Sequence, residues 1–313
     1  MPLIKVAVIG VGFWGRNHAR VYSEIEDVEL AAVCDIDRER SKSVAKRYGC
    51  RSYTDFREML LVEKPDAVSV CTPTITHFEI TSEVLNHGIH SLTEKPLCST
   101  VGEAERLREL AYNLGLKLMP GHIERFNPAV GRIKTLIDEG LLGRIILITA
   151  RRVSRWPERI GDVGVVKDSA IHDVDVMRFL VGDVESVYAK VGSLRHKFED
   201  YVEAILHFKS EATGFIEANW LTPRKIRSLI VTGSEATASL DYISQEVSIE
   251  DSEKVLQPTV KWEEPLVREL KHFIDSVLGR ESLLLTADDG VETLKICEAI
   301  LKSGYKGEKI YLR

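Results

Sequence analysis

The sequence predicts an α/β protein of two domains, an N-terminal doubly wound parallel sheet followed by a C-terminal α+β domain with a mostly antiparallel open sheet. Three observations support this. Apolar runs alternate with helical patterns up to about residue 120, a glycine-rich turn follows the first run, and closely spaced β-rich stretches come later. Alternating strands and helices are typical of parallel sheets, whereas successive strands favour antiparallel ones. The expected domains are therefore 1–121 and 122–313.

Size and composition are those of a globular protein. The chain has 313 residues, of which 44% are hydrophobic and 29% charged, and its net charge is −6. This charge gives no global attraction to nucleic acid or anionic membranes, so an anionic ligand needs local positive charge. Five cysteines without a CxxC pair argue against a disulfide framework or a metal site. With no signal peptide or long apolar run in the sequence, we expect a cytoplasmic protein.

The elements of the first domain follow from apolar spacing. Continuous apolar runs predict strands buried on both faces at 4–9, 28–34, 67–71, 89–92 and 116–119. Between them, helical patterns are found at 14–24, 37–47, 76–87 and 100–114. Thr100 and Glu103 have the spacing of a capping box, which marks the start of the last helix.

The second domain mixes helices with many strands. Helices are predicted near 126–139 and 168–181, and a long strand at 144–153. Five β-rich stretches follow, VESVYAKVGS, YVEAILHF, ATGFIEANWL, IRSLIVTG and ATASLDY, before helices near 265–279 and 287–303.

A glycine motif, GVGFWG, directly follows the first strand. Gly10, Gly12 and Gly15 permit a tight turn and close approach of a pyrophosphate to the N-terminus of the next helix. Phe13 and Trp14 lie inside this motif and are expected beside the cofactor. Asp35 ends the second strand, where a carboxylate binds a ribose 2′-hydroxyl and repels a 2′-phosphate. The sequence therefore predicts NAD, while nearby Arg38 leaves NADP open; a plain turn is the alternative for Asp35.

Two further segments follow strands of the parallel sheet. Thr72, Pro73 and His77 come after the third apolar run, and Glu94-Lys95-Pro96 after the fourth. The carboxyl ends of parallel strands line the ligand crevice, so we expect these residues to flank the cofactor. Lys95 can donate a hydrogen bond to a reacting oxygen.

These segments, together with DSAIHDVD at 168–175, closely resemble the glucose–fructose oxidoreductase / inositol dehydrogenase / rhizopine-catabolism (Gfo/Idh/MocA) family over essentially the whole chain. The resemblance implies NAD-dependent oxidation of an alcohol. It makes Lys95 the catalytic lysine and Asp168 and His172 its partners. It also implies a homodimer or homotetramer formed through the C-terminal sheet.

The spacing around His172 also makes chemical sense. Asp168 and His172 are four residues apart on one predicted helix, and Asp175 follows three residues later. A histidine that titrates near neutral pH can accept an alcohol proton, and a carboxylate can orient it. The alternative is a helix-capping aspartate with a structural histidine. Lys167 could contact phosphate, lower the pKa of His172, or point outward into solvent.

A finer resemblance, carried by GHIERFNPAV, AIHDVDVMRFL and NWLTPRKIR, is to members that oxidise nucleotide-activated amino sugars. Arginines at 151, 152, 155 and 159 offer a patch for a pyrophosphate, although such runs are often solvated strand edges. Expected substrate contacts are Arg155, with Trp156 stacking on a uracil or sugar face, and Arg125 and Asn127 at the domain junction. A helix cap at Asn127, before Pro128, is the alternative for that segment.

The expected activity is removal of a hydride from a sugar secondary alcohol, with oxidation of UDP-N-acetylglucosamine at carbon 3 the most specific form. We expect no metal, because the cofactor carries the chemistry. Alternatives within the same chemistry are an inositol, a free sugar or a UDP-hexuronate. Outside it are an NAD-dependent glycosidase and a non-catalytic nucleotide sensor. No nucleic-acid or membrane partner is expected.

Overall fold

The computed structural model describes residues 3–156 and 161–312, which fold as two compact units. The first comprises Met1–Gly121 and Leu266–Val291, and the second comprises His122–Pro265 and Glu292–Arg313. The division after Gly121 coincides with the expected boundary. The return of residues 266–291 to the first unit differs from the expectation, which placed them in the second domain.

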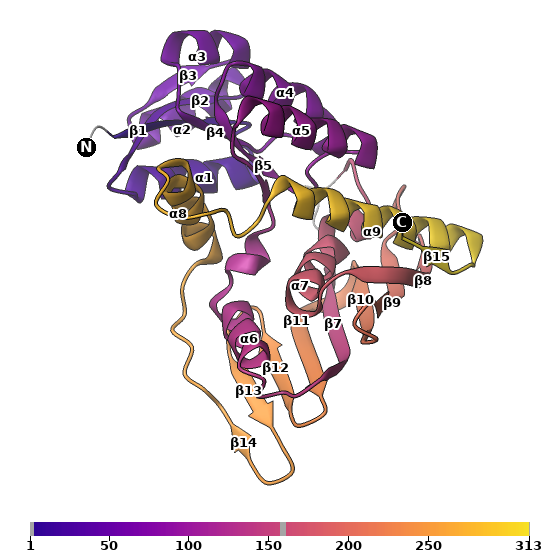
Figure 1. Ribbon diagram of the computed structural model, residues 1–313. Coiled ribbons are helices and arrows are strands. Elements are labelled where there is room, and N and C mark those ends of the chain that lie inside the picture. The colour runs from indigo at the N-terminus through magenta and orange to yellow at the C-terminus, as the bar shows by residue number, and fades with distance from the viewer. Residues whose placement is uncertain (1–2, 157–160, 313) are drawn as a thin grey trace. The chain divides into compact units, whose positions relative to one another are not determined.

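The first unit is built on a six-stranded parallel sheet (Figure 1). Its strand order is β3-β2-β1-β4-β5-β6. Successive strands are added outward on one side from β1 and on the other side from β4, and such sheets bind ligands at this switch point between β1 and β4. The strands are β1 (Ile4–Ile9), β2 (Val28–Cys34), β3 (Arg51–Tyr53), β4 (Ala67–Val70), β5 (His90–Glu94) and β6 (Leu118–Gly121). The short β3 has two exposed residues and was not predicted, because it has no apolar run.

Helices connect these strands, with α1 on one face of the sheet and α4 and α5 on the other (Figure 1). The expected capping box is confirmed: Thr100 accepts from the Glu103 N–H, and the Glu103 carboxylate accepts from the Thr100 N–H. The helices are α1 (Phe13–Glu24), α2 (Arg38–Tyr48), α3 (Phe56–Glu63), α4 (His77–Asn86) and α5 (Val101–Leu114), with a 3₁₀ turn at Thr74–Thr76.

Helix α8 (Pro265–Val277) explains why a C-terminal segment belongs to the first unit. Its buried face carries Leu266, Leu270 and Phe273. After it, the Arg280 guanidinium pairs with Asp27 at 2.6 Å, on the loop before β2. The amphipathic pattern predicts a buried face but does not say which core will receive it.

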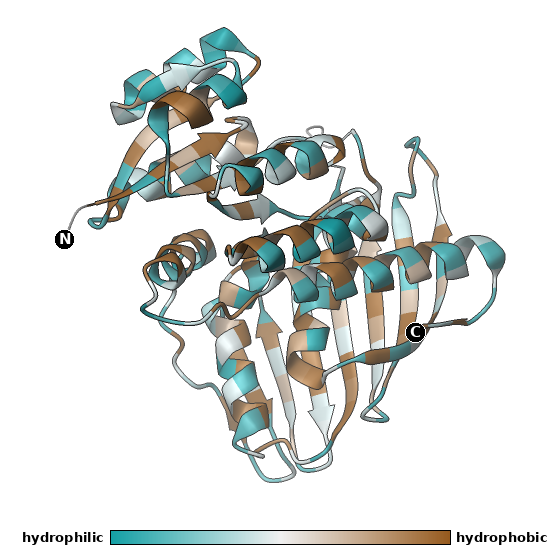
Figure 2. Cartoon of the chain, turned by 45° about the horizontal axis from the view of Figure 1, so that its top comes forward, coloured by the Kyte–Doolittle hydropathy of each residue, from teal (hydrophilic) through white to brown (hydrophobic). Residues whose placement is uncertain are grey.

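The second unit contains a nine-stranded sheet of order β14-β13-β12-β11-β7-β10-β9-β8-β15. All neighbours are antiparallel except β7 and β10, which run parallel. Apolar and polar positions alternate along these strands (Figure 2). The strands are β7 (Ile145–Arg155), β8 (Val184–Gly192), β9 (Tyr201–Phe208), β10 (Thr213–Asn219), β11 (Leu221–Gly233), β12 (Thr237–Asp241), β13 (Val247–Glu250), β14 (Val255–Leu256) and β15 (Ile310–Tyr311).

Three helices cover one face of this sheet and build the core with it: α6 (Pro128–Asp138), α7 (Ile171–Val181) and α9 (Ala287–Lys306). Ile133, Val174 and Ile300 are fully buried between helices and strands. Immediately before α7, residues Val166–Ala170 form a π-helical turn, and 3₁₀ turn Ile123–Phe126 precedes α6. Among the residues described, no helix has the length and hydropathy that crossing a membrane requires.

Candidate active site

The glycine loop after β1 has the shape that a pyrophosphate requires. Gly10 has φ +83°, and a Cβ on Gly15 would lie 1.8 Å from the Gly10 carbonyl oxygen. Both positions therefore need glycine. At Gly12, by contrast, a Cβ would meet nothing within 4 Å. Because no side chain caps the N-terminus of α1, the loop leaves room and N–H donors for an anion.

The aromatic residues of this loop also fit a bound cofactor. Phe13 is 52% exposed at the first turn of α1. The indole nitrogen of Trp14 is buried and has no hydrogen-bond partner among the described residues. A buried donor without a partner is costly, which is consistent with a ligand acceptor at this position.

Asp35 lies at the carboxyl end of β2 and is 6% exposed. Its carboxylate accepts from the backbone N–H groups of Val11 and Asp37, both at 2.9 Å, which ties it to the glycine loop. The cation that contacts it is Arg40, at 3.2 Å, and not the exposed Arg38. Ile36, which sequence reasoning overlooked, is 94% exposed beside it.

The loop after β4 is held by His77, which is 1% exposed. Its ring nitrogens lie 2.9 Å from the carbonyl oxygens of Pro96 and Thr72. A carbonyl oxygen accepts a hydrogen bond from a ring nitrogen that carries a proton. His77 thus joins the loop after β4 to the turn after β5. Its contact with the cofactor, like those of Thr72 and Pro73, stays a prediction.

Lys95 begins the turn after β5, on the edge of the sheet that also carries the glycine loop, and its peptide bond to Pro96 is cis. The neighbouring Glu94 is 9% exposed, and its carboxylate accepts from the Lys95 N–H at 3.2 Å. A Cβ on Gly121 would come within 3.1 Å of this carboxylate. Burial opposes ionisation, but the hydrogen bond and charge of His18, with Lys95, lower the pKa of Glu94.

His18 connects the Lys95 turn to helix α1, although its isolated position in the sequence gave no sign of this. Its ring is fully buried, with Nε2 at 3.2 Å from Glu94 Oε1 and Nδ1 at 3.1 Å from Ser69 Oγ. The same Ser69 hydroxyl lies 2.8 Å from the Tyr22 hydroxyl. A buried polar network of this kind fixes the backbone from which Lys95 projects.

In the second unit, Asp168 belongs to the π-helical turn and His172 to the first turn of α7. The structure therefore differs from the single regular helix that the spacing predicted. π-Helical turns are often found at functional sites. Asp168 is 6% exposed, and its carboxylate accepts from the Ser169 hydroxyl at 3.2 Å.

The two aspartates that follow His172 have other partners. Asp173 accepts two bonds from Arg152, at 2.9 and 3.0 Å, and Asp175 accepts two from Arg125, both at 2.9 Å. All four side chains are buried. Arginine and carboxylate pair bidentately in both cases, so these residues anchor α7 in the turn that follows His172.

Two of the predicted substrate residues, Arg125 and Asn127, make contacts within the protein. Arg125 is fixed by Asp175, and Asn127 accepts from the Ala129 N–H as the N-cap of α6, with Pro128 in the first helical position. These internal contacts account for both side chains, and their contact with a substrate stays a prediction.

The arginine run does not form one patch. Arg152 is buried with Asp173, while Arg151 lies on the outer face of the sheet and pairs with Glu217 at 2.7 Å. Arg155 is exposed at the carboxyl end of β7. Arg159 lies outside the described residues. The sequence pattern could not distinguish these environments, because alternate strand residues face opposite sides.

Trp156 belongs to an aromatic cluster that the sequence did not reveal. Its ring centroid lies 4.4 Å from that of His196, whose ring is 6.0 Å from Trp220. The Trp220 indole donates to Ser169 Oγ at 3.2 Å, and the same hydroxyl donates to Asp168.

Lys167 points to α9, where its ammonium lies 3.4 Å from Glu298.

Comparison with family models identifies both parts of the chain. Residues 4–122 match "Oxidoreductase family, NAD-binding Rossmann fold", and residues 130–239 match "GFO/IDH/MocA C-terminal domain". The first unit is thus an NAD-binding Rossmann domain, and its glycine loop, Trp14 indole and Asp35 fit that cofactor. No cluster of His, Cys, Asp or Glu suited to a metal ion occurs among residues 3–156 and 161–312.

Three similar proteins illustrate the range of relatives. UDP-N-acetylglucosamine 3-dehydrogenase of Acidithiobacillus ferrooxidans is 31% identical over 79% of this chain and 76% of its own. Its crystal structure superposes with a TM-score of 0.89, covering 97% and 98% of the two chains. D-glucoside 3-dehydrogenase of Escherichia coli is 26% identical over 99% and 97%. GenD2 from gentamicin A biosynthesis, solved in complex with NAD, is 26% identical with a TM-score of 0.91 over 100% and 97%.

Proposed function

This chain belongs to the Gfo/Idh/MocA oxidoreductase family and is an NAD-dependent sugar dehydrogenase, and we propose that its substrate is a nucleoside diphosphate sugar. The specific reaction that we propose is oxidation of UDP-N-acetylglucosamine at carbon 3 of the sugar. The main observation behind the assignment of the reacting groups is the position of Lys95. It follows β5 at the cofactor edge of the sheet, next to a buried carboxylate that His18 holds.

The proposed roles follow from the chemistry of each side chain. His172 accepts the proton of the substrate hydroxyl, and Lys95 donates a hydrogen bond to the same oxygen as negative charge develops on it. Asp168 stabilises the protonated histidine. NAD, when bound, supplies the acceptor for the hydride that leaves the carbinol carbon.

The nucleotide part of the proposal rests on two observations. The relative that is 31% identical bears the name UDP-N-acetylglucosamine 3-dehydrogenase. Arg155 and Trp156 are consecutive exposed residues at the end of β7, in the unit that also carries His172. An arginine suits a phosphate and an indole suits the face of a uracil or a sugar.

A second candidate is oxidation of a free glycoside, which the 26% identity to D-glucoside 3-dehydrogenase over nearly the whole chain favours. Steady-state kinetics with UDP-N-acetylglucosamine and with methyl glucoside separate the two. A kcat/KM at least tenfold higher for the nucleotide sugar supports the first proposal, and the reverse order supports the second.

Variants of Lys95 test the assigned roles. We expect Lys95→Ala to lower kcat by about 100-fold or more, since a positioned proton donor or acceptor typically contributes 10²–10⁴. NAD affinity, measured by tryptophan fluorescence, should stay within about twofold of wild type. The control is Lys46→Ala, at an exposed lysine of α2, in which both kcat and NAD affinity should stay within about twofold of wild type. Weakened NAD binding with unchanged kcat at saturation would refute the role of Lys95.

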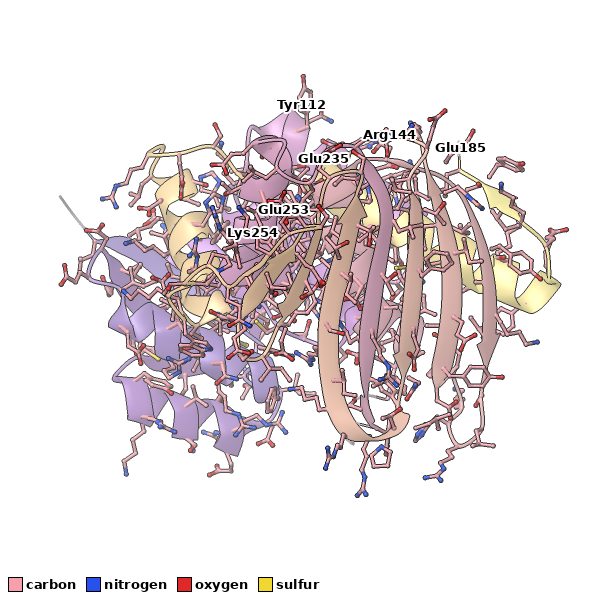
Figure 3. The ribbon with its side chains drawn as sticks, turned by 90° about the horizontal axis from the view of Figure 1, so that it is seen from below. Tyr112, Arg144, Glu185, Glu235, Glu253 and Lys254 are labelled. Carbon is pink, nitrogen blue, oxygen red and sulfur yellow. The ribbon has the colours of Figure 1, made fainter. Side chains whose placement is uncertain are left out.

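We also propose that a second copy of the chain covers the open face of the nine-stranded sheet. Strand register aligns Ile230, Thr149, Phe215, Ile205 and Tyr188 in one row across this face, and four of the five are large and apolar. In the described part of the chain no helix lies over it (Figure 3). Such an exposed patch is typical of an interface.

Light scattering after size exclusion tests this association. Wild type should have the mass of a dimer or tetramer, and Phe215→Glu should shift it toward the monomer, because the charge would be buried without a partner. Lys254→Glu, on the exposed β13–β14 hairpin, is the control (Figure 3). A monomeric wild type would contradict the proposal.

A further inference from the structure

Strand β11 contains a large bulge at its start, opposite the end of β7. Leu221 pairs with Arg155 and Ile226 with Val153, so five residue steps on β11 face two on β7. The four residues 222–225 therefore stand opposite Ser154 alone, and this segment projects from the ladder. Bulges of this kind often re-aim side chains beside functional sites.

The projecting segment is cationic. Arg224 and Lys225 are exposed on the bulge, and Arg227 follows on the strand, partly buried. Arg155 is paired with the residue at which the bulge begins. We call these four residues the cationic bulge: Arg155, Arg224, Lys225 and Arg227. In Figure 3, nitrogen-tipped side chains gather at this end of the sheet, where β10 turns into β11.

Nearby carboxylates do not balance this charge. Glu124 lies 3.5 Å from Arg227, but it already accepts from Arg152 at 2.9 Å, and Asp173 is occupied by Arg152. Arg224 and Lys225 have no ion pair among the described residues. The positive charge of Arg227 and partial burial lower the pKa of Lys225, as expected when cations gather without matching anions.

The bulge is connected to the proposed reaction centre within the same unit. Trp220, directly before it, donates to Ser169, which donates to Asp168. Burial and the charge of Arg152 lower the pKa of Arg227, and the charge of Asp168 is among those that oppose this shift. The surplus of positive charge is thus close to the turn that precedes His172.

We propose that the cationic bulge binds the diphosphate of the nucleotide sugar substrate. Arginines bind phosphate oxygens bidentately, and a lysine adds a mobile point charge, so the set matches two linked phosphates. An uncharged sugar would not need such a surplus in a chain of net charge −6. This inference rests on the proposed function and assigns it a place in the molecule.

Calorimetric titration with UDP tests the inference, with NAD⁺ saturating so that the glycine loop is already occupied. The double variant Arg224→Gln/Lys225→Gln removes two charges, and both residues are exposed, so folding should be unaffected. We expect the Kd for UDP to rise about 10- to 100-fold, the loss of charge-assisted hydrogen bonds. Inorganic pyrophosphate should compete with UDP in wild type and compete poorly in the variant.

Arg144→Gln is the matched control, because this exposed arginine lies at the opposite end of the sheet, next to the start of β7, and pairs with Glu211 (Figure 3). Its UDP affinity should equal that of wild type. Equal affinity in all three proteins would overturn the inference, as would oxidation of UDP-N-acetylglucosamine with an unchanged KM in the double variant. UDP binding that depends on the bulge, without oxidation of any UDP-sugar, would support the inference while refuting the proposed function.

Discussion

Replacing Arg152 by methionine should destabilise the second unit strongly, because this arginine joins strand β7 to the helix that carries His172. Its guanidinium is buried and bonds both Asp173 oxygens and Glu124, at 2.9–3.0 Å. Methionine keeps much of the volume but leaves two buried carboxylates: Glu124 keeps its contact with Arg227 at 3.5 Å, whereas Asp173 loses both of its hydrogen bonds to Arg152.

The size of the effect follows from this geometry. Removing one partner of a buried ion pair costs about 3–5 kcal/mol in the free energy of unfolding. For a unit of this size, that corresponds to a fall in Tm of roughly 6–20 °C. The neighbouring pair between Arg151 and Glu217 is 45% and 38% exposed, so Arg151→Met should cost less than about 1 kcal/mol.

Thermal unfolding of both variants at two pH values provides the assay. Burial raises the pKa of Asp173, and Arg152 opposes this shift. Without Arg152 the folded-state pKa rises further above the unfolded value, so the folded variant binds more protons, and its stability should increase as pH falls from about 7 to about 5. Equal Tm values for the two variants, or a deficit that does not shrink at the lower pH, would refute the reasoning.

Four further substitutions, at three positions, test the first unit. Gly15→Ala should abolish NAD binding in fluorescence titrations without unfolding the protein, since its Cβ would lie 1.8 Å from a loop carbonyl; retained affinity would contradict this. Asp35→Ser should raise the ratio of kcat/KM for NADP to that for NAD, because it removes a repelling charge and releases Arg40; an unchanged ratio would count against this role. His18→Gln keeps a donor toward Glu94 and should retain kcat, whereas His18→Asn should lose roughly 10- to 100-fold at unchanged KM; equal losses in both variants would refute positioning by this bond.

Local motifs made much of the fold and the cofactor site predictable. GVGFWG, Asp35 and the turn at Lys95 are short segments whose chemistry depends on strand ends, and apolar runs locate strand ends well. The parallel order of the first sheet and the mostly antiparallel second sheet followed from the alternation of elements, and both are confirmed.

Long-range partners could not be predicted in the same way. Whether Arg125 and Arg152 face a ligand or an aspartate of α7 depends on strand register and helix rotation, which one sequence does not encode locally. The same holds for His18, whose partner Glu94 is 76 residues away. The π-helical turn at Asp168 has no sequence signature either. The four-residue spacing between Asp168 and His172 therefore led us to predict a regular α-helix through both residues.

The most direct test of the proposed function is NADH formation by the purified protein with NAD⁺, a carbonyl trap and a panel of alcohols. The panel comprises UDP-N-acetylglucosamine, its uronate, UDP-glucose, myo-inositol and glucose. We expect NADH with UDP-N-acetylglucosamine at the highest kcat/KM, and loss of about 100-fold or more in the Lys95→Ala protein. NADH from inositol or glucose alone, or equal rates with and without Lys95, would contradict the proposal.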